Sequence, residues 1–226
     1  MPLLGSAAML LSFDVDADAV DEHDRWHTHE HLPERLSIPG FLRGTRWVAT
    51  EGGPRYMVLY EVESLQTLVS QPYLARLNNP TPWTTKLMPH YRGMTRGLCA
   101  VLGSFGFGYG GSAALIRFRP EDGRAAPLHR WLLEEALPVL PQRPGLGSAH
   151  LLQGAQSAAM TNEQRIRGAD RGVDSAIIVT GYDASALSHC AQTLRGDGDL
   201  GSRGAREASV AIYRCNYSLA RAELDA

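Results

Sequence analysis

The sequence matches itself when it is shifted by 105 residues, and this internal repeat limits the folds that the chain can adopt. The identical pairs are Phe13 and Phe118, Arg25 and Arg130, Trp26 and Trp131, Glu30 and Glu135, Leu32 and Leu137, Pro33 and Pro138, and Pro39-Gly40 and Pro144-Gly145. The register is then lost, because the short turn 51–54 of the first half corresponds to a long segment of the second half, about 153–174. The chain is therefore built from two related units.

Each half shows the order strand, helix, strand, strand, helix, strand. In the first half we expect strands at 8–15, 46–49, 55–63 and 97–103, a helix at 21–36 with Asp21 as its N-cap, and a proline-broken helical region before the last strand. In the second half we expect the matching elements at 113–118, 127–140, 147–152, 175–182, 184–194 and 208–217. The pattern predicts an α+β protein of two fused ferredoxin-like βαββαβ repeats, whose uncovered sheet faces pack together.

A glycine-rich connector separates the two halves. Residues 103–111 contain five glycines with interleaved aromatic residues, and a strand follows them, so a phosphate-binding loop before a helix is not expected. The sequence predicts a first repeat at 1–103, a linker at 104–111, with aromatic side chains over a barrel mouth or neighbouring surface, and a second repeat at 112–226.

The composition favours a globular protein without a charge bias toward nucleic acid or membrane. The 22 Lys and Arg nearly balance the 24 Asp and Glu, and Lys86 is the single lysine, which disfavours Schiff-base chemistry. Cys99, Cys190 and Cys215 are too widely spaced for a metal knuckle and favour a reducing, cytoplasmic location. Residues 1–13 have the pattern of a strand, and no apolar run reaches the roughly 18 residues of a membrane span.

Histidines concentrate on the first predicted helix, where four of the eight lie between His23 and His31. At 100° per residue, His23, His27, Glu30 and Glu34 fall on one stripe, with His31 at its edge. A carboxylate beside an imidazole that titrates near neutrality can fix its tautomer and support proton transfer. The stripe is therefore the candidate catalytic group, although the same spacing also suits a solvated helix face.

The i, i+4 spacing of His27 and His31, or of His23 and His27, also suits a metal with Glu30 or Glu34 nearby and His90 as a third ligand. A haem would instead require one histidine to face its iron. Asp14, Asp16 and Asp18 imitate an EF-hand loop, but Ala19 and Arg25 stand where that loop requires glycine and glutamate, so we expect a solvated strand end.

The internal repeat helps to separate structural residues from candidate functional ones. Trp26 and Glu30 recur as Trp131 and Glu135, which favours a structural task shared by both halves. The residues that do not recur are His23, His27, His31 and Glu34, which are replaced by Leu128, Leu132, Ala136 and Val139. Among the prolines that follow, Trp83, His90, Tyr91 and Arg92 could lie at a pocket mouth. We therefore expect one active half and one scaffolding half.

The first helix carries the motif Trp26-His27-x-x-Glu30-His31-Leu32-Pro33-Glu34-Arg35-Leu36-x-Ile38-Pro39-Gly40-Phe41, which resembles that of the dimeric alpha-beta barrel superfamily, especially its EthD-like branch. The resemblance implies a fused pseudo-dimeric barrel, and an aromatic or polyketide-like substrate for an enzyme of the monooxygenase or isomerase type without a cofactor. Because fusion already pairs the two repeats, further homodimer formation is optional.

The sequence thus predicts a small organic molecule as the partner, held between the first sheet and its helices. His27 or His23 would act as acid or base, Glu30 and Glu34 would orient it, and the ligand would meet Trp26, His31, Trp83, His90 and Tyr91. The alternatives are a non-catalytic barrel that binds a ligand or partner, and a metal- or haem-binding protein.

Overall fold

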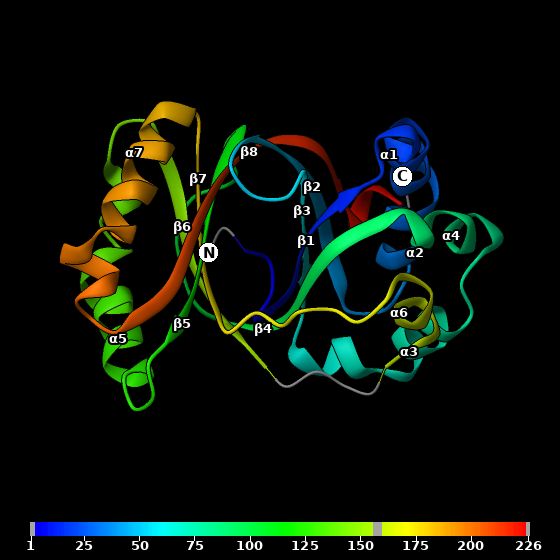
Figure 1. Ribbon diagram of the computed structural model, residues 1–226, viewed down its shortest axis with the longest axis horizontal. Coiled ribbons are helices and arrows are strands. Elements are labelled where there is room, and N and C mark those ends of the chain that lie inside the picture. Colours follow the sequence, from blue (N-terminus) through cyan, green and yellow to red (C-terminus); the bar gives the residue numbers. More distant parts are fainter. Residues whose placement is uncertain (1–2, 156–159, 225–226) are drawn as a thin grey trace.

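The computed structural model describes residues 3–155 and 160–224, and eight antiparallel strands form a closed barrel at its centre (Figure 1). The strands are β1 (Ala7–Val15), β2 (Phe41–Glu51), β3 (Tyr56–Val62), β4 (Tyr91–Gly106), β5 (Ser112–Pro120), β6 (Leu146–Gly154), β7 (Ser175–Gly181) and β8 (Ala205–Ala220). Each repeat contributes a four-stranded sheet, in the orders β4-β1-β3-β2 and β8-β5-β7-β6. The pairs β2–β8 and β4–β6 join the two sheets, which confirms the predicted fusion of ferredoxin-like repeats.

Helices cover the outer face of each sheet (Figure 1). The first repeat contains α1 (Val20–Trp26), a π turn (His27–His31), α2 (Leu32–Leu36), α3 (Gln71–Asn78) and α4 (Pro82–Leu87). The second contains α5 (Ala125–Trp131), a π turn (Leu132–Ala136), α6 (Asn162–Arg167), α7 (Ala184–Arg195) and a further π turn (Asp197–Gly201). Short 3₁₀ turns lie at Ala17–Ala19, Leu65–Val69, Met88–His90, Leu140–Gln142 and Arg221–Glu223.

The repeat seen in the sequence is preserved in the backbone. β1 and β5, α1 and α5, and the π turns that follow α1 and α5 all begin and end 105 residues apart. Gly40 and Gly145, at the matching turns into β2 and β6, both have a φ of +87°, a left-handed conformation that glycine adopts without steric cost. Local sequence therefore imposes the same path on both halves as far as the second strand.

Several predicted boundaries differ from the structure. The first helix begins at Val20, and Asp21 is in its first turn instead of at the N-cap, a position held by Ala19 without a side-chain hydrogen bond. The helix expected at 127–140 starts at Ala125, and its π turn ends at Ala136. β2 begins at Phe41, five residues before the predicted 46, and β4 continues through Gly106 into the predicted linker. Both strands extend beyond their apolar runs because they pair with strands of the other repeat, β2 with β8 and β4 with β6.

The barrel interior holds one core, and each helical layer covers another. Trp47, Met57, Leu59, Ile178 and Tyr213 are among the buried residues inside the barrel, contributed by strands of both repeats. The two outer cores each draw mainly on one repeat. The two sheets are thus joined by a common core as well as by strand pairing.

The aromatic residues around the predicted linker have three different environments. Tyr109 donates a hydrogen bond to the buried Glu61 carboxylate (2.7 Å) and packs edge-on against Trp47. Phe105 packs against the second outer core, whereas the side chain of Phe107 is 93% exposed. Tyr109 alone therefore reaches into the barrel.

The segment that breaks the repeat reaches the other half of the molecule. α6 belongs to the second repeat in sequence, but it packs beside α3 on the helical face of the first repeat (Figure 1). After α6, the segment is attached to β4 by a backbone hydrogen bond of 2.8 Å from the Arg96 amide to the Arg171 carbonyl. The first helical layer therefore contains an element that the second layer lacks.

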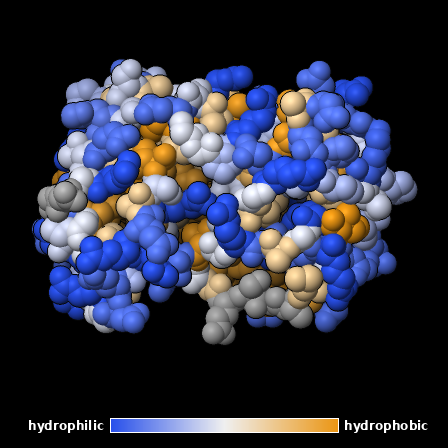
Figure 2. Space-filling view, viewed as in Figure 1, coloured by the Kyte–Doolittle hydropathy of each residue, from blue (hydrophilic) through white to orange (hydrophobic). Residues whose placement is uncertain are grey.

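The face in Figure 2 is mainly hydrophilic, and its hydrophobic side chains form small separate groups. Among the residues that the structure describes, no helix is both long and apolar enough to cross a membrane.

Candidate functional site

Three histidines form a buried row on the helix that covers the first sheet. The side chains of His23, His27 and His31 are between 0% and 7% exposed, whereas His29 points to solvent. Ring centroids are 5.5 Å apart both between His23 and His27 and between His27 and His31. The row (His23, His27 and His31) faces the outer surface of the sheet and is not a solvated helix face.

The π turn explains why His31, rather than Glu30, continues this row. The Leu32 amide donates to the His27 carbonyl five residues earlier, so the turn contains one residue more than an α-helical turn. A regular α-helix would bring Glu30 beside His23 and His27. The extra residue rotates Glu30 away and gives its place to His31. The predicted stripe is therefore wrong in its composition.

The two glutamates of that stripe have other partners. Glu30 accepts hydrogen bonds from Trp26 Nε1 (3.1 Å) and Thr81 Oγ1 (2.6 Å), which attach α1 to the start of α4. Glu34 accepts from Arg35 Nη1 (3.2 Å), and burial raises the pKa of its carboxyl. Neither carboxylate contacts a histidine of the row, so neither can orient an imidazole directly.

A cavity lies between the row and the first sheet. Its free volume is about 30 Å³, room for about two water molecules. Its wall combines apolar, aromatic and charged side chains from both repeats: Met9, Leu11, Phe13, His27, His31, Arg35, Tyr60, Tyr73, Leu77, Met88, Tyr91, Met94, Arg96, Thr161, Glu163, Gln164 and Arg167. The position agrees with the predicted pocket between the first sheet and its helices.

His23 has hydrogen-bond partners on both ring nitrogens. Nδ1 lies 3.1 Å from Asp24 Oδ1, and Nε2 lies 3.2 Å from the hydroxyl of Tyr91. The Asp24 carboxylate also accepts a hydrogen bond from Tyr56 (2.8 Å). His23 is thus held behind the cavity, with Tyr91 between it and the open space.

His27 and His31 are less well satisfied. His27 Nε2 lies 3.5 Å from the Tyr60 hydroxyl, and Nδ1 of both His27 and His31 is buried without a hydrogen-bond partner among the residues described. An unsatisfied buried polar atom costs about 1–3 kcal/mol. Native structures seldom tolerate this cost without a reason, such as a role in ligand binding or catalysis.

Burial keeps the row uncharged near neutral pH. The pKa values of His27 and His31 lie well below that of free histidine, first because of burial and then because of neighbouring positive charges, including Arg35. Burial also lowers the pKa of His23, although its hydrogen bond to Asp24 opposes this effect. A neutral imidazole retains one lone pair and can accept a proton.

Arginines supply most of the charge on the cavity wall. Arg35 pairs with the Glu163 carboxylate of α6, and both side chains are almost completely buried. Arg167 forms a two-pronged pair with Asp170, with distances of 3.0 and 2.7 Å. Arg96 donates from Nη2 to the Tyr73 hydroxyl at 3.3 Å. Two of the three guanidinium groups therefore have carboxylate partners.

Of the other predicted ligand-binding residues, Tyr91 alone lines the cavity. Trp26 is fully buried, and Trp83 packs against the first outer core and donates to Glu22 (3.2 Å). His90 is partly exposed and pairs with Asp16 (3.2 Å). Residues 81–92 therefore contribute Met88 and Tyr91 to the cavity wall, but not their tryptophan or histidine.

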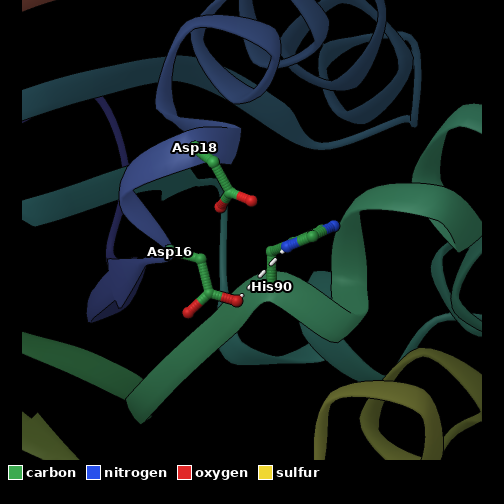
Figure 3. A group of neighbouring side chains, drawn as sticks. All are labelled: Asp16, Asp18 and His90. Atoms are coloured by element: carbon green, nitrogen blue, oxygen red, sulfur yellow. Dashed lines mark hydrogen bonds and ion pairs between the residues drawn. The ribbon is translucent and has the colours of Figure 1, made fainter.

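The arrangement does not match the predicted metal ligands. Within 3–155 and 160–224, the one group of three with metal-ligating atoms close together is Asp16, Asp18 and His90, at the end of β1 (Figure 3). Arg92 Nη2 already lies 2.6 Å from Asp16. His90 is therefore not a third ligand for His27 and His31. The cavity of about 30 Å³ would have to open much further for a haem than for a single aromatic ring.

The equivalent helix in the second repeat has no such site. Leu128 and Leu132 are buried in an apolar core at the positions of His23 and His27. His129 is buried nearby, but it binds Ser175 (3.1 Å) and faces a different, open groove. The row of buried histidines is therefore a feature of the first repeat alone among the residues described.

Sequence reasoning missed Arg35 beside the row, and it missed the residues that distant segments bring to the cavity. The latter are Tyr60, Tyr73, Arg96, Thr161, Glu163, Gln164 and Arg167. Arg35 was present in the recognised motif, and the length of the 153–174 segment was itself a signal. Nothing in the linear sequence indicated that this segment would cross to the first repeat.

No family model matches the chain, and no curated protein matches it. Solved structures share its fold over nearly the whole length. An anthrone oxidase-like protein is 10% identical, with a TM-score of 0.63 and coverage of 98% of this chain and 96% of the other. A putative monooxygenase from Fusobacterium nucleatum is 7% identical, with a TM-score of 0.59 and 96% coverage of both chains.

Chlorite dismutase from Candidatus Nitrospira defluvii, solved with imidazole, is 11% identical, with a TM-score of 0.58 and coverage of 96% and 92%. These neighbours are dimeric alpha-beta barrel proteins. At such low identities they establish the fold of this chain, whereas the predicted likeness to the EthD-like branch stays a prediction.

Proposed function

Because the chain has the dimeric alpha-beta barrel fold, with a cavity between the first sheet and its helical layer, we propose that it binds a small aromatic molecule there and that His27 transfers a proton on it. The observation that carries this proposal is the buried Nδ1 atom of His27, which has no partner among the residues described. The imidazole lies on the wall of a cavity that combines apolar and aromatic side chains with charged ones.

The surroundings of His27 suit a base. When Nε2 carries the proton it faces the Tyr60 hydroxyl, and Nδ1 then offers its lone pair. Burial lowers the pKa of the imidazole, which keeps it neutral at pH 7 with a free lone pair but also weakens it as a base. A negative charge left on the ligand would stabilise the imidazolium that proton transfer forms. The Tyr91 hydroxyl, held by His23 at 3.2 Å, provides a second polar group on the same wall.

The ligand class is inferred from the wall and from the neighbours together. Phe13, Leu77 and three methionines offer an apolar surface on which an aromatic ring can pack. An anthrone oxidase-like protein and monooxygenase-like proteins are among the structural neighbours. Oxidation of anthrone by O₂ to anthraquinone and water begins with loss of a proton from its CH₂ group, a step that a neutral imidazole can perform.

Binding and turnover can be tested separately. Phenol, a small aromatic with a labile proton, should shift the ring NMR signals of His27 and His31 in protein labelled with ¹⁵N-histidine. Anthrone in air should be converted to anthraquinone. His27→Leu, which copies Leu132 of the second repeat, should lower turnover about 100-fold or more, as expected for loss of a general base. The matched control is His29→Leu, on the exposed side of the same π turn.

Each outcome has a different meaning. Phenol binding without turnover of anthrone would support the non-catalytic alternative and reject His27 as a base for this substrate. If phenol shifts neither histidine signal, the cavity is not the binding site and the proposal is wrong.

A further inference from the structure

We infer that the cavity prefers an aromatic carboxylate to a neutral aromatic molecule and that Arg96 binds its negative charge. This inference rests on the proposed function, because it names the class of molecule that the cavity would hold. It comes from a difference among the three arginines of the cavity wall.

Arg96 is placed on the helix-facing side of the first sheet by strand alternation. It lies on β4 between Met94 and Leu98, and both of these side chains belong to the outer core of the first repeat. Its main chain is paired with Leu11 of β1 and also donates to the Arg171 carbonyl. The side chain therefore starts from a rigid backbone and reaches the cavity between apolar neighbours.

The guanidinium of Arg96 lacks the carboxylate partner that the other two have. Arg35 is neutralised by Glu34 and Glu163, and Arg167 by Asp170. Among the residues described, the polar partner of the Arg96 side chain is the Tyr73 hydroxyl, and no carboxylate oxygen lies within 4 Å. Arg96 is thus the cation of the cavity that still has donors to offer.

Arg96 is the position on the wall that favours an anion. Glu34, Glu163 and Asp170 pair with Arg35 and Arg167, so the guanidinium of Arg96 is the one of the three that a bound anion can contact without displacing a carboxylate of the residues described. A partly buried cation is stabilised strongly by an anion that hydrogen-bonds to it, and the planar guanidinium can bind both oxygens of a carboxylate. The Tyr73 hydroxyl, 3.3 Å from Arg96 Nη2, lies close enough to contribute to the same binding site.

The remainder of the wall can adapt to a ring. Met9, Met88 and Met94 all line the cavity, and the unbranched side chain of methionine repacks readily around a guest. The free volume of about 30 Å³ is smaller than a benzene ring, so these side chains must move when a ring enters. A carboxylate at Arg96 would then direct the ring toward His27 and His31.

The test compares benzoate with benzamide, which have nearly the same shape but differ in charge. Dissociation constants measured by NMR titration should favour benzoate by about tenfold or more, as expected for a charge-assisted hydrogen bond. Arg96→Gln should reduce this preference to about twofold or less, whereas Arg96→Lys should retain part of it. Arg117→Gln is the control, because Arg117 also has no carboxylate partner in 3–155 and 160–224 but lies outside the cavity.

The results separate this inference from the proposed function. Equal binding of benzoate and benzamide would overturn the charge preference and leave the binding of aromatic molecules intact. A preference for benzoate that survives Arg96→Gln would show that another cation is responsible, and the assignment of Arg96 would be wrong. If Arg96→Gln does not fold, the ratio for the unaltered protein and for Arg96→Lys still decides whether the cavity selects anions.

Discussion

The two repeats share a backbone path but differ in chemistry. Their first strands, helices and π turns correspond at a constant offset of 105 residues. His23, His27 and His31 of the first repeat are replaced by Leu128, Leu132 and Ala136 of the second. The same helix therefore carries a polar row beside a cavity in one repeat. In the other it carries an apolar row, of which Leu128 and Leu132 are buried in the core and Ala136 borders a surface pocket.

This difference shows which features belong to the fold. π turns are often associated with functional sites, and the turn at His27–His31 would by itself suggest one. The second repeat has the same turn at Leu132–Ala136, with an apolar residue in place of each histidine of the row. The π turn is thus part of the repeat itself, and the function depends on the side chains that it carries.

The repeats also differ in what joins their second and third strands. The first has a tight turn between β2 and β3, whereas the second has the long segment that contains α6. α6 places Glu163 against Arg35 in the helical layer of the first repeat. The scaffolding repeat therefore completes the site of the other.

The largest expected effect comes from breaking this contact. Glu163→Ala leaves Arg35 buried with only Glu34 as a direct partner, and we expect the free energy of unfolding to fall by about 3 kcal/mol. Urea denaturation measures this change. The double variant Arg35→Met/Glu163→Leu should recover most of the loss, because apolar side chains can replace a buried ion pair. A loss below about 1 kcal/mol in Glu163→Ala would show that α6 is not energetically part of the first repeat.

The second prediction concerns acid stability. The pKa of His27 is lowered in the folded protein, so below about pH 6.5 the unfolded chain binds a proton that the folded protein excludes. Stability should therefore fall as the pH falls, by about 1.4 kcal/mol per pH unit for each such histidine. His27→Leu should remove one histidine's share of this slope between pH 6 and 5, as measured by urea denaturation.

His29→Leu is the matched control for this experiment, because His29 is exposed and should leave the slope unchanged. Part of the slope should remain in both variants, since burial also lowers the pKa of His150, inside the barrel, to about 3. Identical slopes in His27→Leu and the unaltered protein would show that His27 is not held neutral by the fold.

Much of the fold could be predicted because it depends on local and repeated signals. The Pro-Gly turns and the 105-residue offset defined both repeats, and alternation of apolar residues located most strands. Strand ends were less accurate, since β2 and β4 are lengthened by pairing with β8 and β6 from the other repeat. Such pairing depends on the closed barrel and leaves no local pattern in the sequence.

The candidate site was predictable only in part, for a physical reason. His27, His31 and Tyr91 were identified from their residue types and spacing, and all three line the cavity. Glu30 was misplaced because a constant rotation of 100° per residue does not hold through a π turn. Glu163 could not be found, because a contact between residues 128 positions apart depends on the tertiary fold.

The smallest expected effect comes from the residues that the repeats have in common. Glu30 accepts hydrogen bonds from Trp26 and Thr81, whereas Glu135 is exposed and makes no hydrogen bond within the part of the chain that the structure describes. Trp131 instead packs beneath Arg203, with the guanidinium carbon 4.1 Å from its ring centroid. The shared Trp and Glu therefore do not perform one common structural task.

Glu30→Gln should lower the free energy of unfolding by about 1 kcal/mol, because a neutral amide is a weaker acceptor than a carboxylate for the Trp26 and Thr81 donors. Glu135→Gln should change it by less than about 0.5 kcal/mol, the usual range for an exposed side chain. Both variants make the same chemical change at equivalent backbone positions, so the difference between their urea midpoints isolates the hydrogen bonds of the first repeat. Equal effects would mean that Glu30 and Glu135 both stabilise only their own helix, and that the hydrogen bonds of Glu30 do not stabilise the attachment of α1 to α4.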